Sequence, residues 1–183
     1  MKQIVNYINE RLHITTKSHL HRSYTCNPQT KDELRKIIIQ RIEDDGQECD
    51  LNDIDVSDIT DMSHLFNADY NAIFKTFNGD VSQWDVSNVK DMTCMFYKCE
   101  QFNCDLSRWD VSNVEDMHWM FNWCIKFNCD LSGWDVSNVT NMTSMFDWCK
   151  QFNQNLDNWD VSNVTKMIFA FYECPTQPKW YKE

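Results

Sequence analysis

The sequence predicts an α+β fold, in which a solenoid of about five 25-residue coils follows an N-terminal helical cap. Three observations predict it. A block of 25 residues occurs four times in succession between residues 77 and 176. A divergent fifth copy precedes the four at residues 49–76, and an amphipathic helical pattern precedes that copy. A fixed period of this length is typical of coils that stack on one another and bury equivalent side chains in columns.

The N-terminal cap is expected over residues 1–48. Its main helix begins at Thr30, which forms a capping box with Glu33, and ends at Gly46. Leucine and isoleucine residues between these limits recur at helical spacing and predict an apolar stripe that docks on the first coil. A first, shorter helix is indicated by Ile4, Ile8 and Leu12.

Six apolar positions recur in the complete blocks and predict the core. They comprise two phenylalanines, a tryptophan, two valines and a methionine, which one coil alone cannot bury. Their spacing predicts a short strand flanked by tight turns, and the stretch from Phe96 to Phe102 predicts one turn of helix that closes the coil. In the first complete block the six are Phe77, Trp84, Val86, Val89, Met92 and Phe96.

The block boundaries define the domain organisation. The cap is followed by the repeat region, residues 49–176, and by a tail, residues 177–183. The first coil carries a five-residue insertion near residues 68–76, and the tail residues Trp180 and Tyr181 are expected to cover the last coil. The five coils are expected at residues 49–76, 77–101, 102–126, 127–151 and 152–176.

Polar residues also recur in every complete block, at Asp85, Ser87 and Asn88 in the first. The chain has only three glycines and three prolines, so these side chains are expected to form the turns by bonding to nearby backbone groups. Calcium binding by the recurring carboxylates is the alternative. The sequence lacks the glycine-rich nonapeptide loops typical of calcium-binding repeats, which favours the structural interpretation.

These columns resemble those of the BspA-like leucine-rich repeat family, bacterial surface-protein repeats written around a WDVSNVTNM core. Residues 49–176 carry the resemblance through four WDVSNV segments and one IDVSDI segment, and residues 28–66 look like the region often found ahead of such repeats. The resemblance implies a leucine-rich-repeat-type solenoid that binds proteins or mediates adhesion, with no catalytic residues. Many members are secreted or lipid-anchored, and this sequence shows neither feature.

The first residues contain no apolar run long enough for a signal peptide, because Glu10 and Arg11 interrupt it. No stretch of the sequence approaches the length of a membrane span. A cytoplasmic protein that does not bind membranes is therefore expected. An export signal upstream of Met1 would reverse this expectation.

The repeat region is strongly acidic. Residues 49–176 hold 20 acidic side chains against 7 basic ones, and the whole chain has a net charge of −11. This charge argues against direct nucleic-acid binding and favours a basic protein partner. The five histidines follow no column and no glycine-rich phosphate-binding loop is present, so no enzymatic activity is expected.

Eight of the nine cysteines follow the repeat or nearly so, and they are expected to pack as small apolar residues in the core. Two other interpretations stay open. Zinc is suggested by two CX4C pairs, and disulfides are suggested by the number of cysteines. The favoured interpretation predicts folding without metal, disulfide or cofactor. The paired cysteines are Cys99, Cys104, Cys124 and Cys129.

The variable columns of a repeat protein determine its specificity, because the invariant columns only build the scaffold. Trp123 and Trp148 share a column with Lys98 and Glu173, so this column is expected to face solvent. Adjacent exposed tryptophans are typical of binding hot spots. Packing against each other or against Trp180 is the alternative. The candidate binding residues are Tyr97, Trp119, Trp123, Trp148, Phe169 and Tyr172.

The sequence thus favours a non-enzymatic protein–protein interaction module with an acidic face. Its small size, its acidity and the missing export signal suggest an inhibitor of a host protein that a phage or mobile element carries. A bacterial surface adhesin or antigen is the alternative that the resemblance implies. An acidic mimic of nucleic acid is a second alternative, and it requires exposed carboxylates at regular spacing.

Overall fold

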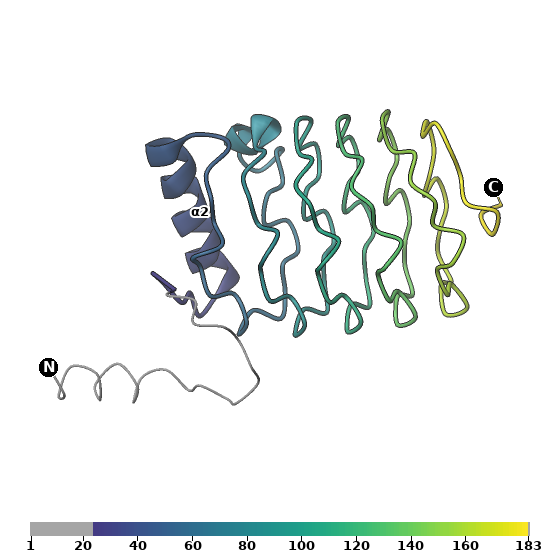
Figure 1. Cartoon of the computed structure of the whole chain (residues 1–183), viewed down its shortest axis with the longest axis horizontal. Coiled ribbons are helices and arrows are strands. Elements are labelled where there is room, and N and C mark those ends of the chain that lie inside the picture. Colours follow the sequence, from purple (N-terminus) through teal and green to yellow (C-terminus); the bar gives the residue numbers. More distant parts are fainter. Residues whose placement is uncertain (1–23, 183) are drawn as a thin grey trace, which may run out of the picture.

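The computed structural model describes residues 24–182. Within them the chain forms one α-helix, α2 (Lys31–Asp45), and one 3-10 helix, η1 (Ala72–Thr76), and neither is long and apolar enough to cross a bilayer. Beyond α2 the backbone runs in successive coils that lie side by side along the longest axis of the molecule (Figure 1). The helix expected around Ile4, Ile8 and Leu12 falls outside the described residues.

Helix α2 forms where the sequence predicts it. The Thr30 hydroxyl accepts a hydrogen bond from the N–H of Glu33 at 3.2 Å, and the Glu33 carboxylate accepts one from the N–H of Gln29 at 2.8 Å. Gly46 ends the helix with a φ of 92°, which glycine adopts without strain. The predicted apolar stripe is buried at Leu34, Ile38 and Ile42.

Polar contacts hold α2 against the first coil. Lys31 forms an ion pair with Asp61 at 2.7 Å and donates to the Ser63 hydroxyl at 2.7 Å. One turn further on, the Arg35 guanidinium donates to the backbone carbonyl oxygen of Leu65 at 3.4 Å. Carbonyls at the equivalent position of later coils accept from the N–H groups of the preceding coil. The helix therefore takes the place of a preceding coil at this end of the stack.

One row of backbone hydrogen bonds joins each coil to the next. Alternate N–H groups of one coil donate to carbonyl oxygens of the following coil, and isolated parallel bridges mark the start of this row. In the second coil the donors are Met92, Cys94, Phe96 and Lys98, and their acceptors, at 2.8 to 3.0 Å, are Asp116, His118, Met120 and Asn122.

Two local predictions are wrong. The strand expected within each coil is reduced to single bridge residues. The stretch from Phe96 to Phe102 contains consecutive tight turns instead of a turn of α-helix, since the N–H of Cys99 donates to Phe96 and the N–H of Phe102 donates to Cys99. The reason is Lys98, whose left-handed φ of 60° interrupts a right-handed helix.

The predicted core columns are buried in the first four coils, whereas Val161, Val164 and Met167 of the fifth coil are only partly buried. Each invariant tryptophan is at most 5% exposed and donates its indole N–H to a backbone carbonyl in the preceding coil, as Trp109 does to Val81 at 3.0 Å. The indole rings of Trp84 and Trp109 lie parallel within 5°, with centroids 6.5 Å apart. A buried indole N–H needs an acceptor, so this bond explains why the column tolerates tryptophan in a dry core.

The cysteines lie in or against the core. The thiol of Cys124 donates to the carbonyl oxygen of Phe96 at 2.9 Å, and other cysteines of its column make the same bond one coil apart. Burial raises the pKa of Cys104 to about 12 and the pKa of Cys129 to about 11. Within residues 24–182, no three His, Cys, Asp or Glu side chains are grouped so that they could hold a metal ion. The CX4C pairs are therefore not gathered into a zinc site.

The polar columns make the turns. The Asp85 carboxylate accepts from both the N–H and the hydroxyl of Ser87, at 3.1 and 2.6 Å, and the next residue, Asn88, donates to the carbonyl oxygen of Ser57 in the preceding coil at 2.9 Å. The same pair of contacts recurs one coil later at Asp110. The recurring carboxylates thus satisfy turn backbone, which is the structural role predicted for them.

The insertion predicted in the first coil forms η1. Asn71 caps it by accepting from the N–H of Ile73 at 3.1 Å, and its Phe74 is fully buried with its ring edge-on to Phe66. Gly79 follows, and a Cβ there would lie 2.6 Å from the carbonyl oxygen of Cys49. Glycine is therefore required where the chain leaves the insertion and rejoins the stack.

The tail covers part of the last coil, as predicted. The indole of Trp180 stacks on that of Trp159, with centroids 6.4 Å apart and planes 16° from parallel. Tyr181 lies edge-on to the buried ring of Phe171, at a centroid distance of 5.2 Å. The tail therefore extends the tryptophan column by one member and closes that side of the stack.

Candidate binding face

All the positive φ angles of non-glycine residues in the described chain fall in two variable columns. The values lie between 50° and 63°, in the left-handed region. An L-residue there costs about 1 kcal/mol or more, and glycine or asparagine is the usual choice. The first column holds His64, Cys94, Trp119, Ser144 and Phe169. The second holds Lys98, Trp123, Trp148 and Glu173.

The large side chains of these two columns reach the surface, whereas the small ones, Cys94 and Ser144, are buried. The residues between them, such as Met95 and Phe96, are fully buried, whereas Tyr97 and Lys98 are partly exposed. All six predicted binding residues belong to the two columns or to the column of Tyr97. We call them the aromatic face: Tyr97, Trp119, Trp123, Trp148, Phe169 and Tyr172.

Trp123 and Trp148 lie side by side, as predicted. Their rings are 3° from parallel with centroids 4.3 Å apart, and the ammonium of Lys150 lies 4.1 Å from the centroid of the Trp148 ring. Each indole covers one side of the other, so both are half-buried rather than substantially exposed, which corrects the expectation from sequence. They pack on each other and not on Trp180, which stacks on Trp159.

Trp119 is the most exposed tryptophan of the aromatic face, at 41%. Its indole stacks on the ring of Tyr97 in the preceding coil, with centroids 5.6 Å apart and planes 19° from parallel. The imidazole of His118 lies edge-on to the same indole. The structure thus joins the column of Tyr97 to the column of Trp119, which sequence spacing alone did not establish.

A second exposed aromatic group lies on the last coil. Phe169 is 54% exposed and Tyr172 is 43% exposed, and their rings meet edge to face at 5.7 Å. Ile168, beside them, is 67% exposed. One sequence signal marks Ile168, because the other members of its column, Thr143 among them, are polar.

Polar residues separate the two exposed groups along the stack. Asn122 and Ser144 are buried, and the Asn122 amide donates to the Asp147 carboxylate at 3.1 Å. Burial raises the pKa of Asp147, although the bond from Asn122 opposes the rise. The other carboxylate oxygen of Asp147 is buried without a hydrogen-bond partner. This stretch is therefore the least well satisfied part of the face.

Ion pairs border the face. Lys98 pairs with Asp69 at 2.8 Å, and Lys150 pairs with Glu173 while it covers Trp148. The hydrogen bond and charge of Asp69 raise the pKa of Lys98. These lysines are neutralised locally, so the face presents aromatic surface and not net positive charge.

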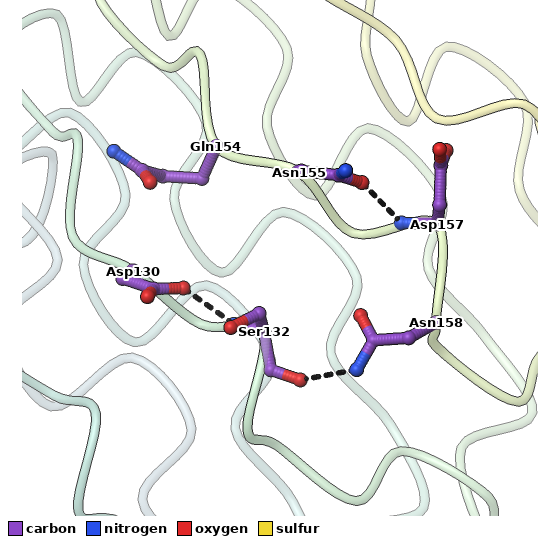
Figure 2. Close-up of a pocket in the computed structure, with 6 residues that line it drawn as sticks. All are labelled: Asp130, Ser132, Gln154, Asn155, Asp157 and Asn158. Atoms are coloured by element: carbon purple, nitrogen blue, oxygen red, sulfur yellow. Dashed lines mark hydrogen bonds between the residues drawn. The ribbon is translucent and has the colours of Figure 1, made fainter.

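An open polar hollow of about 420 Å³ lies between the turns of the fourth and fifth coils. Figure 2 shows that its amide and carboxylate side chains mostly bond to neighbouring turn atoms. Asn155 accepts from the N–H of Asp157 at 2.8 Å, and Asn158 donates to the carbonyl oxygen of Ser132 at 2.7 Å. The hollow therefore offers turn geometry and no convergent reactive groups.

The comparisons with known proteins give a family. The family model described as "Mycoplasma protein of unknown function, DUF285" matches residues 38–122 and 68–180. No curated protein matches the chain, and no solved structure does. The two matched segments together span well over half of the sequence, so the chain belongs to the DUF285 family, which is related to the BspA-like surface repeat proteins.

Proposed function

We propose that the chain is a leucine-rich-repeat-type solenoid that acts as a non-enzymatic protein–protein interaction module, with its partner docked on the aromatic face. One observation carries the proposal. Large aromatic side chains occupy left-handed backbone positions and remain exposed, as Trp119 and Phe169 do.

Stability does not account for these side chains. Cys94 and Ser144 occupy the same column as Trp119 and Phe169 with the same left-handed backbone, so the coil does not require an aromatic residue there. A bulky residue at positive φ is strained, and its exposed apolar surface is costly in water. Aromatic residues are enriched at the hot spots of interfaces, where a partner would cover them.

The charge of the repeats favours a basic partner. The turn carboxylates of Asp110, Asp135 and Asp160 are exposed along one edge of successive coils. Hydrogen bonds from Ser137 and Ser162 lower the pKa of Asp135 and Asp160, which keeps them ionised. A complementary basic surface would be steered toward this acidic edge, and its association rate would fall as salt rises. We propose a cytoplasmic setting for this encounter.

The test is comparative capture with matched variants. The immobilised full chain is exposed to extract of its native host, and retained proteins are identified by mass spectrometry. Trp119→Ser and Phe169→Ser place at each position the residue that Ser144 already provides in the same column. We expect a specific protein that the wild-type chain retains and that both variants lose.

Thermal melts provide the control, because both substitutions are expected to leave the melting temperature within a few degrees of wild type. If the retained proteins are the same for the wild-type chain and the two folded variants, the aromatic face is not the docking site. If the partner is instead lost when only the carboxylates of Asp110, Asp135 and Asp160 are removed by substitution, the encounter is purely electrostatic.

A further inference from the structure

The last coil ends in an unpaired row of backbone donors. In the fourth coil, the N–H groups of residues 142, 144, 146 and 148 donate to carbonyl oxygens of the fifth coil at 2.7 to 2.9 Å. The equivalent N–H groups of the fifth coil have no acceptor among residues 24–182. We call this row the open edge: Met167, Phe169, Phe171 and Glu173.

Apolar side chains next to the open edge are also uncovered. Val136, Val139 and Met142 in the fourth coil are at most 1% exposed. Their equivalents in the fifth coil are only partly buried, because the tail packs on Trp159 and Phe171 and does not cover them. These equivalents are Val161, Val164 and Met167.

The donors define what fits the open edge. A complementary segment must present carbonyl oxygens at alternate residues, together with apolar side chains at a spacing of three. Residues 141–148 present such a row to the third coil. Pairing with an added strand-like segment is an established way for one polypeptide to bind another.

A second copy of the chain does not fit. Two open edges brought face to face would oppose N–H groups with N–H groups. The carbonyl row of the first coil is covered by α2, where Arg35 bonds to Leu65 and Lys31 bonds to Asp61. Docking of that row on the open edge would require α2 to be displaced.

We propose that the open edge binds a coil-like segment of a different polypeptide, which presents a row of backbone carbonyls and covers Val161, Val164 and Met167. The segment pairs with the four N–H groups as a further coil would. This interface lies at the end of the stack and goes beyond docking on the aromatic face. Exchange rates of the open-edge amides distinguish the two.

The probe is a capped synthetic peptide with the sequence of residues 136–148, and its control is the same composition in scrambled order. Amide hydrogen exchange is followed by NMR on the full chain. In the free protein, the amides of the open edge are expected to exchange at least about 100-fold faster than those of residues 142–148. The repeat peptide, at up to about 1 mM, should slow exchange at the open edge only.

Val164→Lys is the matched variant, because it places a charge beside the open edge on a partly exposed position. We expect it to abolish the slowing by the peptide, while protection at residues 142–148 shows in the same spectra that the stack is intact. The proposal is overturned if both peptides slow exchange equally or if neither slows it. It is also overturned if the open edge is already protected in the free chain, or if the chain self-associates through this end as its concentration rises. Trp119→Ser should leave peptide binding unchanged, so failure of the aromatic face does not imply failure here.

Discussion

The indole N–H of Trp180 donates to the carbonyl oxygen of Leu156 at 2.7 Å, as Trp159 does to Leu131 one coil earlier at 3.0 Å. A tail residue outside the repeat thus reproduces a bond of the invariant column. It stacks on Trp159 in the same orientation, so the tail supplies the partner that the last coil would otherwise lack.

Alanine substitution of a tryptophan in the invariant column and of the tail tryptophan should therefore lower the free energy of unfolding by different amounts. Trp109→Ala removes a side chain that is 3% exposed, leaves Val81 without its donor, and should lower the free energy of unfolding by about 3–5 kcal/mol. Trp180→Ala removes a partly exposed ring at the end of the stack and should cost about 1–2 kcal/mol. Urea unfolding of both variants measures the difference, and equal costs would show that the tail is as integral as an internal coil.

The two glycines of the repeat region should respond oppositely to alanine. A Cβ at Gly79 would lie 2.6 Å from the Cys49 carbonyl oxygen, so Gly79→Ala should destabilise by about 1–3 kcal/mol. A Cβ at Gly133 meets nothing within 4 Å and its φ is not positive, so Gly133→Ala should stabilise by about 0.4–1 kcal/mol. The melting temperatures of the two variants measure this difference. If both alanine substitutions raise the melting temperature, the backbone after η1 can shift to accommodate the Cβ at Gly79.

The stacked pair of Trp123 and Trp148 should be energetically coupled. A double-mutant cycle with alanine at both positions is expected to give a coupling of about 0.5–1.5 kcal/mol, since the parallel rings shield each other from water. The control is a second cycle that combines Trp123→Ala with Trp109→Ala. Because Trp109 is distant, the two changes in the free energy of unfolding should be additive. Coupling near zero for the stacked pair would show that the two rings separate in solution.

The invariant columns could be predicted from the sequence because identical residues at a fixed period have identical environments. Trp109 and Cys124 are buried for that reason, and each takes a carbonyl acceptor in the preceding coil. Helix α2 was predictable because Thr30 and Gly46 signal its ends chemically.

The backbone of the aromatic face could not be predicted in this way. Left-handed positions are normally signalled by glycine or asparagine, but here Trp119 and Lys98 occupy them, so the sequence carried no sign of the turns. Exposure of Trp123 was overestimated because its stacking partner lies 25 residues away and covers it only once the coils are in register. The unpaired donors of the open edge depend on where the tail folds, which no local pattern reveals.

Stability should not depend on metal or disulfides. Each of the nine cysteines is a free thiol, and those of the Cys124 column donate to backbone carbonyls. We expect thermal melts to be unchanged by a chelator or a reductant. Alkylation of the folded chain at pH 8 should be slow at Cys104, because its pKa of about 12 leaves few thiolates, and fast after unfolding. A melting temperature that drops with chelator would support the zinc interpretation.

Asp147 should make the stability of the chain depend on pH in a defined direction. Burial raises its pKa in the folded state, so the protonated form is favoured there. The stabilisation of the folded state by the proton on Asp147 is fully present below the unfolded pKa of about 3.9, and it is lost as pH rises through the raised folded pKa. Asp147→Asn, which places there the residue that the preceding coil has at Asn122, removes the penalty and should stabilise by about 1 kcal/mol at pH 7.

The advantage of Asp147→Asn should shrink below the folded pKa and disappear near pH 3.5, as the wild-type carboxyl becomes protonated. Urea unfolding of both proteins at intervals between pH 3.5 and pH 8 measures it. Asp135→Asn is the opposite control, because hydrogen bonds from Ser137 lower the pKa of Asp135 and its substitution should cost stability at neutral pH. An advantage for Asp147→Asn that stays constant across this range would mean that the gain comes from a new hydrogen bond of the amide and not from removal of a buried charge.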